Sequence, residues 1–324
     1  MTVSAILERI SSRKVLVVGD ICLDRWCTYD PGLAEPSRET GIDRVAVVST
    51  LITAGAGGTV ANNLAALGAA SISVLGAVGD DGHGYELRQA LARVGVDDSL
   101  LVPTPGATFT YTKLLNKDSG EEDLGRVDYI APPPPPENER QIVERLLAHA
   151  PRFDAVIVSD QAETETGGVV TAGVRRALAD LATQHPSLLI WVDSRLRPEL
   201  FRRVVVKPNE REAREACQRL GSHDFRALHR AVGHPLMMIT HGGEGVLIYE
   251  GEQESWVRTR PVENPVDICG AGDSFSAGAV LALAAGASPA EAARFGNIVA
   301  SVTIMKKGTG TASPAEVLLA ESRQ

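Results

Sequence analysis

The chain repeatedly places a short run of apolar residues, then a glycine, then a helical pattern. The run from Lys14 to Gly19 is continuously apolar after its first residue and ends in glycine, which is typical of a strand buried in a parallel sheet. The same order recurs at 71–94, and strands again alternate with helices over 139–220. Strands and helices in this rhythm predict βαβ units. We therefore expect one compact α/β body built on a mostly parallel sheet.

Three β-rich stretches do not fit this rhythm. They cover residues 44–50, 108–116 and 125–130, and a polar tip separates the last two. We expect them to form a small antiparallel sheet set apart from the main one, as a lid made from residues 28–52 and 107–131. The five prolines Pro132 to Pro136 exclude both a helix and a central strand and are expected to form a stiff connection back to the main body. No repeat or long linker divides the chain, so residues 1–324 are expected to be a single domain.

Composition excludes several kinds of partner. The net charge is -9 without any cluster of Lys and Arg, so we expect neither nucleic acid nor an anionic membrane as a general partner. No apolar run approaches the roughly 20 residues that cross a bilayer, and the first ten residues read as an amphipathic helix rather than a signal peptide. Four cysteines lack metal-ligand spacing. We interpret them as free thiols of a cytoplasmic protein.

The stretch from Asp267 to Gly278 looks like an anion cradle with a base attached. Gly270, Ala271 and Gly272 form a small-residue turn directly before an apolar helical run. Backbone N–H groups at such a helix start bind negative charge. The next residue is Asp273, which would act either as a cap of the helix or as a chemical group at the cradle.

Two other stretches have the composition of ligand sites. Asp20 and Asp24 follow the first strand at the edge of the sheet where α/β proteins bind ligands. Their alternative interpretation is that they are solvated loop acids. The small-residue run from Ala54 to Thr59 precedes a helix and allows a ligand to approach the backbone closely. It lacks the Gly-Lys-Ser/Thr ending of a P-loop.

Taken together, the motifs resemble those of the ribokinase-like (PfkB) family of carbohydrate kinases over almost the whole chain. Asp267-x-x-Gly-Ala-Gly-Asp273 is similar to the C-terminal signature of the family. Gly55 to Gly68 occupies the place of its N-terminal signature. Thr240-x-Gly-x-x-Gly245 resembles its nucleotide turn, and Lys207-Pro-Asn-Glu-Arg-Glu212 resembles its Asn-x-x-Glu motif.

Within this family, the chain most resembles the D-glycero-beta-D-manno-heptose 7-phosphate kinases. Three stretches carry this likeness: Val18-Gly-Asp-Ile-Cys-Leu-Asp-Arg25 at the start, Arg126-Val-Asp128 in the middle, and Phe295-Gly-Asn297 with Lys307 to Ser313 near the end. The resemblance implies an ATP-dependent phosphotransferase with a three-layer α/β/α fold and a β lid that pairs between the subunits of a homodimer. It also implies Mg²⁺, leaves room for a monovalent cation, and makes the acceptor a sugar or sugar phosphate.

The resemblance also implies roles for individual residues. Asp273 would be the base that takes the proton of the acceptor hydroxyl, and Gly270, Ala271 and Gly272 would donate amides to the phosphoryl group. The positions expected along the sugar are Asp24, Gly55, Gly57, Gly58, Thr59, Asn63 and Arg126. The positions expected along the nucleotide are Asn209, Thr240, Gly242, Gly245 and Asn297, and those expected to hold magnesium through waters are Asn209 and Glu212.

Physical chemistry supports such a set independently of the likeness. Phosphoryl transfer depends on positioning and charge stabilisation, and an amide cradle supplies the second. A carboxylate beside the acceptor can orient the hydroxyl and receive its proton. A magnesium ion needs oxygen ligands and keeps several waters, which one Glu and one Asn can accommodate. A lid would exclude water that otherwise attacks ATP.

The chain departs from the resemblance where the acceptor is chosen. Thr59 stands where the sugar-contacting asparagine of the family would fall, and Ala56 replaces the second glycine of a pair. Glu163 stands where the heptose kinases carry a lysine, which reverses the local charge; Arg38 and Arg195 are candidates to compensate. The open alternatives are a kinase of another phosphosugar or of a nucleoside and, in a different class, a catalytically silent sugar-binding protein.

Overall fold

The computed structural model describes residues 1–130, 132–164 and 166–322. Its main sheet is made of β1 (Lys14–Gly19), β4 (Ser71–Leu75), β9 (Ala155–Asp160), β10 (Leu189–Ser194), β11 (Val205–Val206), β12 (Leu236–Thr240), β13 (Gly245–Glu250) and β14 (Gln253–Arg258). Within the described residues these eight strands lie in the order β14-β13-β12-β11-β10-β9-β1-β4. The strands from β4 to β12 pair in parallel, and β13 and β14 continue the sheet as an antiparallel hairpin.

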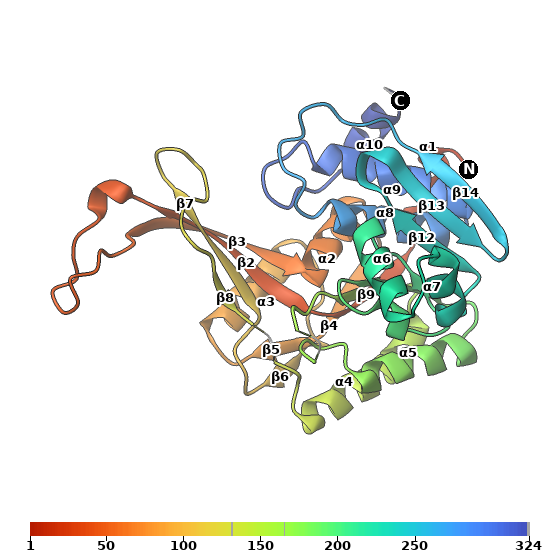
Figure 1. Cartoon of the computed structure of the whole chain (residues 1–324), viewed down its shortest axis with the longest axis horizontal. Helices are drawn as coiled ribbons and strands as arrows, with labels where there is room; N and C mark the ends of the chain where they lie inside the picture. Colours follow the sequence, from red (N-terminus) through yellow and green to blue (C-terminus); the bar gives the residue numbers. More distant parts are fainter. Residues whose placement is uncertain (131, 165, 323–324) are drawn as a thin grey trace.

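Helices cover both faces of this sheet (Figure 1). One layer holds α1 (Val3–Ile10), α2 (Gly57–Ala66), α3 (Gly82–Arg93), α8 (Ala271–Ala284), α9 (Pro289–Thr303) and α10 (Pro314–Glu321). The other holds α4 (Pro136–His149), α5 (Ala172–Gln184), α6 (Glu210–Arg219) and α7 (Phe225–Val232). Alternate residues of β1 feed the two cores: Val15 and Val17 face the first layer, Leu16 and Val18 the second. The three-layer α/β/α fold expected from the sequence is confirmed.

A second, smaller sheet projects from the main body on the left of Figure 1. It consists of β2 (Ile21–Tyr29), β3 (Val47–Ala56), β7 (Thr110–Asn116) and β8 (Val127–Tyr129), in the order β3-β2-β7-β8. The structure thus places the segments expected to form a lid in this sheet and its connections. The sheet is mixed rather than antiparallel, because β2 pairs in parallel with β7. A separate pair, β5 (Ala77–Gly79) and β6 (Val102–Thr104), lies nearby.

The two sheets join at Asp20, which is not a solvated loop acid. Only this residue separates β1 from β2, and its buried carboxylate accepts the backbone N–H groups of Gln161 and Val169, each at 2.8 Å. Its carbonyl accepts the N–H of Gly57 at 2.9 Å, where α2 begins. Burial raises the pKa of Asp20 to about 6, with the charge of Asp160 acting in the same direction. Asp20 therefore connects the second sheet to the main sheet and to the start of α2.

Several local features differ from the expectation. The chain after Asp20 continues as a strand, so Asp24 lies on β2 rather than in a loop. Pro136 is the first residue of α4, a position where its missing N–H has no helical partner to lose. Two short helices, α7 and α10, were not expected. The four cysteines are free thiols, as expected. Across the described residues, no helix has both the length and the apolar character needed to cross a bilayer.

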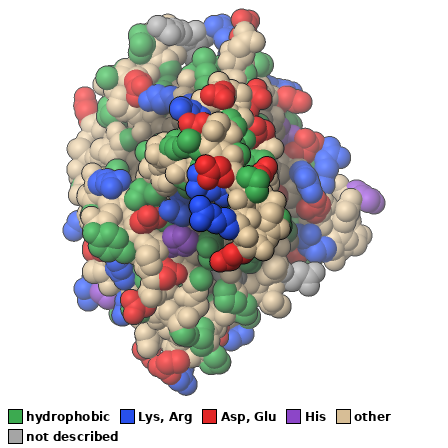
Figure 2. All heavy atoms as spheres, turned by 90° about the vertical axis from the view of Figure 1, so that its left-hand side faces the viewer, with side chains coloured by type: hydrophobic (Ala, Val, Ile, Leu, Met, Phe, Trp, Pro, Cys, Tyr) green, Lys and Arg blue, Asp and Glu red, His purple; other side chains and the backbone are tan. Residues whose placement is uncertain are grey.

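The outer end of the second sheet exposes apolar side chains. Figure 2 views the molecule from this end and shows them interspersed with side chains of both charges. The exposed fraction is 72% for Ile42, 62% for Leu51 and 50% for Val127. Apolar side chains gathered at one end of a molecule mark a surface that another protein can cover.

Candidate active site

Two cavities meet at the start of α8. The smaller cavity, of about 190 Å³, lies between the second sheet and the body and is lined by Asp24, Thr59 and Arg126 among others. The larger cavity, of about 560 Å³, extends over the body past α6 and β12. Both cavities are lined by Gln161, Arg195, Gly270 and Asp273. Two ligands, one bound in each cavity, could therefore come into contact beside Asp273.

Asp273 lies in the first turn of α8 and does not form its cap. The N-cap is Gly270, which adopts a left-handed conformation with φ 77° and makes no side-chain cap bond. Burial in the cavity walls raises the pKa of Asp273 to about 7, the charge of Asp193 adds to the rise, and Lys207 opposes it. The side chain remains partly accessible to solvent. The group is thus a carboxyl poised to exchange a proton near neutral pH.

The turn before Asp273 has the character of an anion cradle. A helix start leaves backbone N–H groups without helical partners, and Gly270, Ala271 and Gly272 all line the larger cavity. One of the three amides is used internally, because the N–H of Ala271 donates to the carbonyl of Ile268 at 3.2 Å. A Cβ added to Gly272 would lie 3.3 Å from Lys207 Nζ, so an ammonium group lies beside the turn.

Lys207 and Asp193 form a buried ion pair that was not expected from the sequence. Their side chains are 2.5 Å apart, and Ser276 Oγ donates to Asp193 Oδ2 at 3.3 Å. Burial lowers the pKa of Lys207, but the charges of Asp193, Glu212 and Asp273 and the hydrogen bond to Asp193 together outweigh burial, so the net shift is upward. Both residues lie at the carboxyl ends of strands, Asp193 on β10 and Lys207 directly after β11. That position is the signal that could have identified them.

The two residues expected to hold magnesium also cap a helix. Asn209 Oδ1 accepts the N–H of Glu212 at 2.9 Å and Glu212 Oε2 accepts the N–H of Asn209 at 2.8 Å, which is a capping box at the start of α6. Burial, reinforced by Asp193, raises the pKa of Glu212 to about 7. No group of three or more His, Cys, Asp or Glu that could hold a metal occurs in the described part of the chain. The donor set suits an ion that keeps most of its waters.

The residues expected along the nucleotide all line the larger cavity, namely Asn209, Thr240, Gly242, Gly245 and Asn297. The Nδ2 group of Asn297 is buried without a hydrogen-bond partner among the described atoms, so it is free to bond a ligand. Gly245 is required by the fold itself: its φ is 115° and an added Cβ would meet the carbonyl oxygen of Val257. Backbone conformation and packing alone therefore explain why position 245 is a glycine.

Asp24 faces the smaller cavity from β2. Its pKa is raised to about 6 by burial, while Lys113 acts in the opposite direction. Gly55 lies on the adjacent strand β3, where it pairs with Cys22, and does not line either cavity; a Cβ there would lie 2.4 Å from the carboxylate atoms of Asp24. The glycine thus makes room for the aspartate.

Thr59 lines the smaller cavity and is 2% exposed, whereas Asn63 does not line it. The amide of Asn63 instead donates to the carbonyl of Thr59 at 3.0 Å inside α2. Gly57 and Gly58 serve close packing at the start of α2, because an added Cβ would meet Ile21 Cδ1 at 2.6 Å and Ala54 Cβ at 2.5 Å respectively. Four residues expected along the sugar therefore lie behind the cavity wall: Gly55, Gly57, Gly58 and Asn63.

Ala56 lines the smaller cavity in a strained backbone conformation. Its φ is 51°, a region that residues with a Cβ rarely adopt. The position is the one where the family resemblance expects a glycine. The backbone has kept a shape suited to glycine although the side chain has changed.

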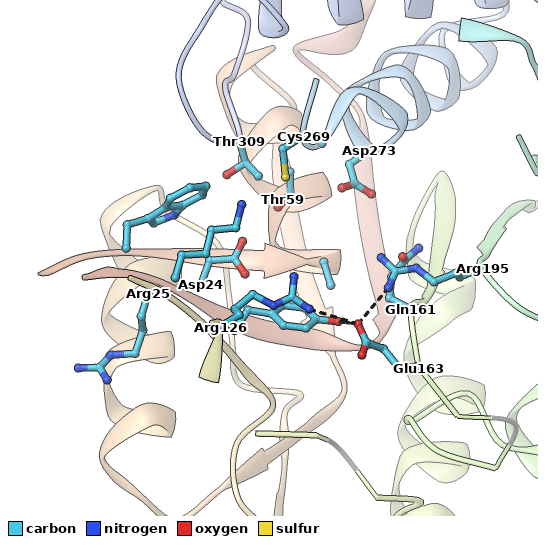
Figure 3. Close-up of a pocket in the computed structure, with 15 residues that line it drawn as sticks. Asp24, Arg25, Thr59, Arg126, Gln161, Glu163, Arg195, Cys269, Asp273 and Thr309 are labelled. Atoms are coloured by element: carbon cyan, nitrogen blue, oxygen red, sulfur yellow. Dashed lines mark hydrogen bonds and ion pairs between the residues drawn. The ribbon is translucent and has the colours of Figure 1, made fainter. Parts of the chain in front are cut away.

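Glu163 joins three other residues of the smaller cavity (Figure 3). Its Oε1 accepts the hydroxyl of Tyr111 at 2.9 Å, lies 3.3 Å from Arg195 Nη1, and lies 3.9 Å from Arg126 Nη2. The guanidinium of Arg126 lies over the ring of Tyr111, 4.8 Å from its centroid. These contacts link β7, the loop before β8 and the segments after β9 and β10. No local sequence pattern predicts such a cluster.

Comparison with known proteins agrees with this geometry. Residues 12–316 match the family described as pfkB family carbohydrate kinase. The chain therefore belongs to the pfkB family of carbohydrate kinases. Two solved structures share the fold: phosphofructokinase-2 from Escherichia coli (TM-score 0.72, 20% identity, 96% of this chain and 99% of that one) and ribokinase from Thermotoga maritima (TM-score 0.71, 17% identity, 96% and 99%).

Curated relatives support the nearness to heptose kinases expected from the sequence. The chain is 32% identical to the bifunctional protein HldE of Pelobacter propionicus, over 98% of this chain and 65% of the relative. It is 33% identical to that of Geobacter sulfurreducens, over 98% and 64%. The chain thus spans slightly less than two thirds of the length of each of these relatives.

Proposed function

We propose that this enzyme transfers the γ-phosphoryl group of ATP from the larger cavity to a hydroxyl of a sugar bound in the smaller one. The observation that carries the proposal is the position of Asp273, which lines both cavities beside the Gly270–Gly272 turn. The larger cavity of about 560 Å³ suits a nucleotide and the smaller one of about 190 Å³ suits a sugar.

In this proposal Asp273 is the general base. Its carboxylate orients the acceptor hydroxyl and takes its proton as the new P–O bond forms, and the departing ADP carries away the negative charge of the broken bond. The free amides of the turn and the ammonium group of Lys207 stabilise the charge on the transferred group. Asp24 accepts hydrogen bonds from the sugar hydroxyls, and Gln161 and Arg195 lie at the junction where transfer takes place.

The residues present fit a magnesium ion held with its waters. Glu212 and Asn209 would hold it, because they line the larger cavity with oxygen donors, and the nearby buried Asp193 adds negative charge. When bound, such an ion neutralises the phosphates of ATP. A monovalent cation is also part of the proposal, since the phosphofructokinase-2 structure that shares the fold is a complex with potassium.

The acceptor is a sugar or a sugar phosphate. The likeness to the relatives favours a heptose 7-phosphate, and 32% identity over 98% of the chain supports that candidate. The departures at Thr59 and Glu163 lie in the smaller cavity, where the acceptor is selected. Both departures therefore bear on which acceptor the enzyme binds.

The exposed outer end of the second sheet is proposed to pair with a second copy of the chain. Ile42, Val48, Leu51 and Val127 are 49–72% exposed there, and covering apolar surface favours association. In such a homodimer the second sheet would act as a lid that excludes water from the smaller cavity.

Replacing Asp273 tests the proposed role directly. ADP release is measured over a panel of sugars, sugar phosphates and nucleosides, and ATP binding is measured by calorimetry. Asp273→Asn is expected to lower turnover by about 10²–10⁴-fold, because the base is lost, while ATP affinity stays within a few-fold. The matched control is Asp180→Asn, an exposed acid on α5, which should leave both unchanged.

Two results would contradict the proposal. Undiminished turnover in Asp273→Asn would remove the base from the mechanism. Absence of ADP release from every acceptor with the wild-type enzyme would favour a silent sugar-binding protein.

A further inference from the structure

The smaller cavity contains four cationic side chains, and each already has an acidic partner. Arg25 Nε lies 3.1 Å from Glu86, Lys113 Nζ 3.8 Å from Glu122, Arg126 Nη2 2.7 Å from Asp128 and Arg195 Nη1 3.3 Å from Glu163. Three of these acids do not line the cavity. Glu163 alone among them lines the cavity itself.

Glu163 occupies the place between two guanidinium groups. Its Oε1 lies 3.3 Å from Arg195 Nη1 and 3.9 Å from Arg126 Nη2, and it also accepts the hydroxyl of Tyr111. In Figure 3 the side chains of Arg126 and Arg195 lie on either side of Glu163, whereas Arg25 points away from it. Two arginines and a hydroxyl converging on one point would suit a phosphate group. Here the protein supplies the anion from its own chain.

We propose that Glu163 replaces the phosphate of a phosphorylated acceptor, so that this kinase selects a sugar without a phosphate at that end. The inference rests on the proposed sugar kinase function and names its acceptor class. A phosphate brought to Arg126 and Arg195 would lie against the carboxylate of Glu163, and like charges in contact disfavour binding. It would also have to displace the ion pairs that Glu163 makes.

The rest of the cavity suits uncharged hydroxyl groups. Asp24 accepts hydrogen bonds, and Thr59, Gln161 and Thr309 line the cavity with neutral polar groups. Lys113 lies 4.4 Å from the ring centroid of Trp26 and is paired with Glu122, which leaves little uncompensated positive charge for a second anion. The described lining therefore offers a neutral polyhydroxyl acceptor more partners than it offers a dianion.

The test compares each sugar with its own phosphate. Five- to seven-carbon sugars, with and without a terminal phosphate, are supplied with ATP and magnesium, and kcat/KM is measured by ADP release. For the wild-type enzyme the unphosphorylated sugar is expected to be preferred by about hundredfold. Glu163→Gln keeps the shape and the bond to Tyr111 but removes the charge, and is expected to shift the ratio toward the phosphate by about tenfold or more.

The matched control is Asp180→Asn. This exposed acid lies on α5 and lines neither cavity, so the ratio should stay within about twofold of wild type. A wild-type enzyme that prefers the sugar phosphate, or a Glu163→Gln variant with an unchanged ratio, would overturn the inference.

A binding measurement separates this inference from the proposed function. Inorganic phosphate is titrated by calorimetry into the enzyme saturated with ADP and magnesium, so that the larger cavity is filled. Glu163→Gln is expected to bind phosphate at least tenfold more tightly than wild type, and addition of Arg126→Met is expected to abolish the gain. Equal phosphate affinity in wild type and Glu163→Gln would overturn the inference. Absence of ADP release with every sugar would instead remove the proposed function.

Discussion

The two cavities that meet at Asp273 are built in different ways. The larger one is lined by helix starts, glycines and a single buried ion pair between Lys207 and Asp193, all attached to the main sheet. The smaller one is lined by long side chains from both sheets, joined in partly exposed ion pairs around Glu163. In the proposed function, the phosphoryl donor would thus be held largely by backbone groups and the acceptor largely by side chains. A backbone site changes little when residues are replaced, whereas a site of side chains changes its ligand with one substitution.

The largest expected effect compares one cation from each cavity. Lys207→Met leaves Asp193 buried without its partner, and we expect a loss of about 3–5 kcal/mol in the free energy of unfolding. Arg126→Met removes a cation whose side chain is 40% exposed, so we expect a loss within about 1 kcal/mol. Urea titration of both variants measures the difference. Similar losses for the two would show that the cavities do not differ in this way.

A second prediction concerns the loss of protein stability that the ionised carboxylate of Asp273 causes in its buried position. The pKa is 3.8 in the reference state and about 7 in the folded protein, so the folded state binds more protons between about pH 4 and pH 7. The stabilising contribution of the protonated form is therefore present below pH 4 and is lost as the pH rises through 7. The amide of Asp273→Asn cannot ionise. The melting temperature of this variant is therefore expected to exceed that of the wild type at pH 8 and to equal it at pH 4.

Differential scanning fluorimetry at the two pH values provides the measurement. A rise of roughly 2–4 °C at pH 8 would correspond to about 1 kcal/mol in a protein of this size. Glu212 and Asp24 also have raised pKa values and titrate in both proteins. The charge of Asp24 helps to raise the pKa of Asp273, so the variant also relieves this repulsion at pH 8, which acts in the same direction. A variant that melts below wild type at pH 8 would show that the carboxylate is stabilised where it lies.

The smallest expected effect on turnover is that of a substitution at the outer end of the second sheet. Leu51→Glu places a charge on a side chain that is 62% exposed, and it is expected to convert the proposed dimer into monomers with turnover within about threefold. Leu147→Glu on α4, 41% exposed in the wild type, is the matched control and should leave the dimer intact. Sedimentation velocity distinguishes the two. A monomeric wild-type protein would contradict the proposed pairing.

The sequence predicted what is encoded in short contiguous stretches. The layered fold follows from the alternation of apolar strands and helices, and the start of α8 follows from three small residues before an apolar run. Two helices could have been predicted and were not. The signals were Asp224 and Gly233 at the ends of α7, and the capping box of Ser313 with Glu316 at the start of α10.

The cluster around Glu163 could not have been predicted in this way. Its partners Tyr111, Arg126 and Arg195 are 32–52 residues away in the chain, and only the packing of the second sheet on the body brings them together. The same holds for Gly55, whose residue type suggested a ligand contact. Its actual neighbour is the carboxylate of Asp24 on the adjacent strand, which local patterns do not reveal.

The attachment at Asp20 determines how far different parts of the second sheet would move if the sheet tilted. β2 leaves the body at this residue, and the start of α2 is bonded to the same point through Gly57. At about 3.3 Å per residue, Asp24 lies roughly 13 Å along the strand from the pivot and Tyr29 roughly 30 Å. A tilt of the sheet about Asp20 therefore moves the far end more than twice as far as Asp24. A change in the tilt of the second sheet would therefore alter the positions of its outer residues more than that of Asp24.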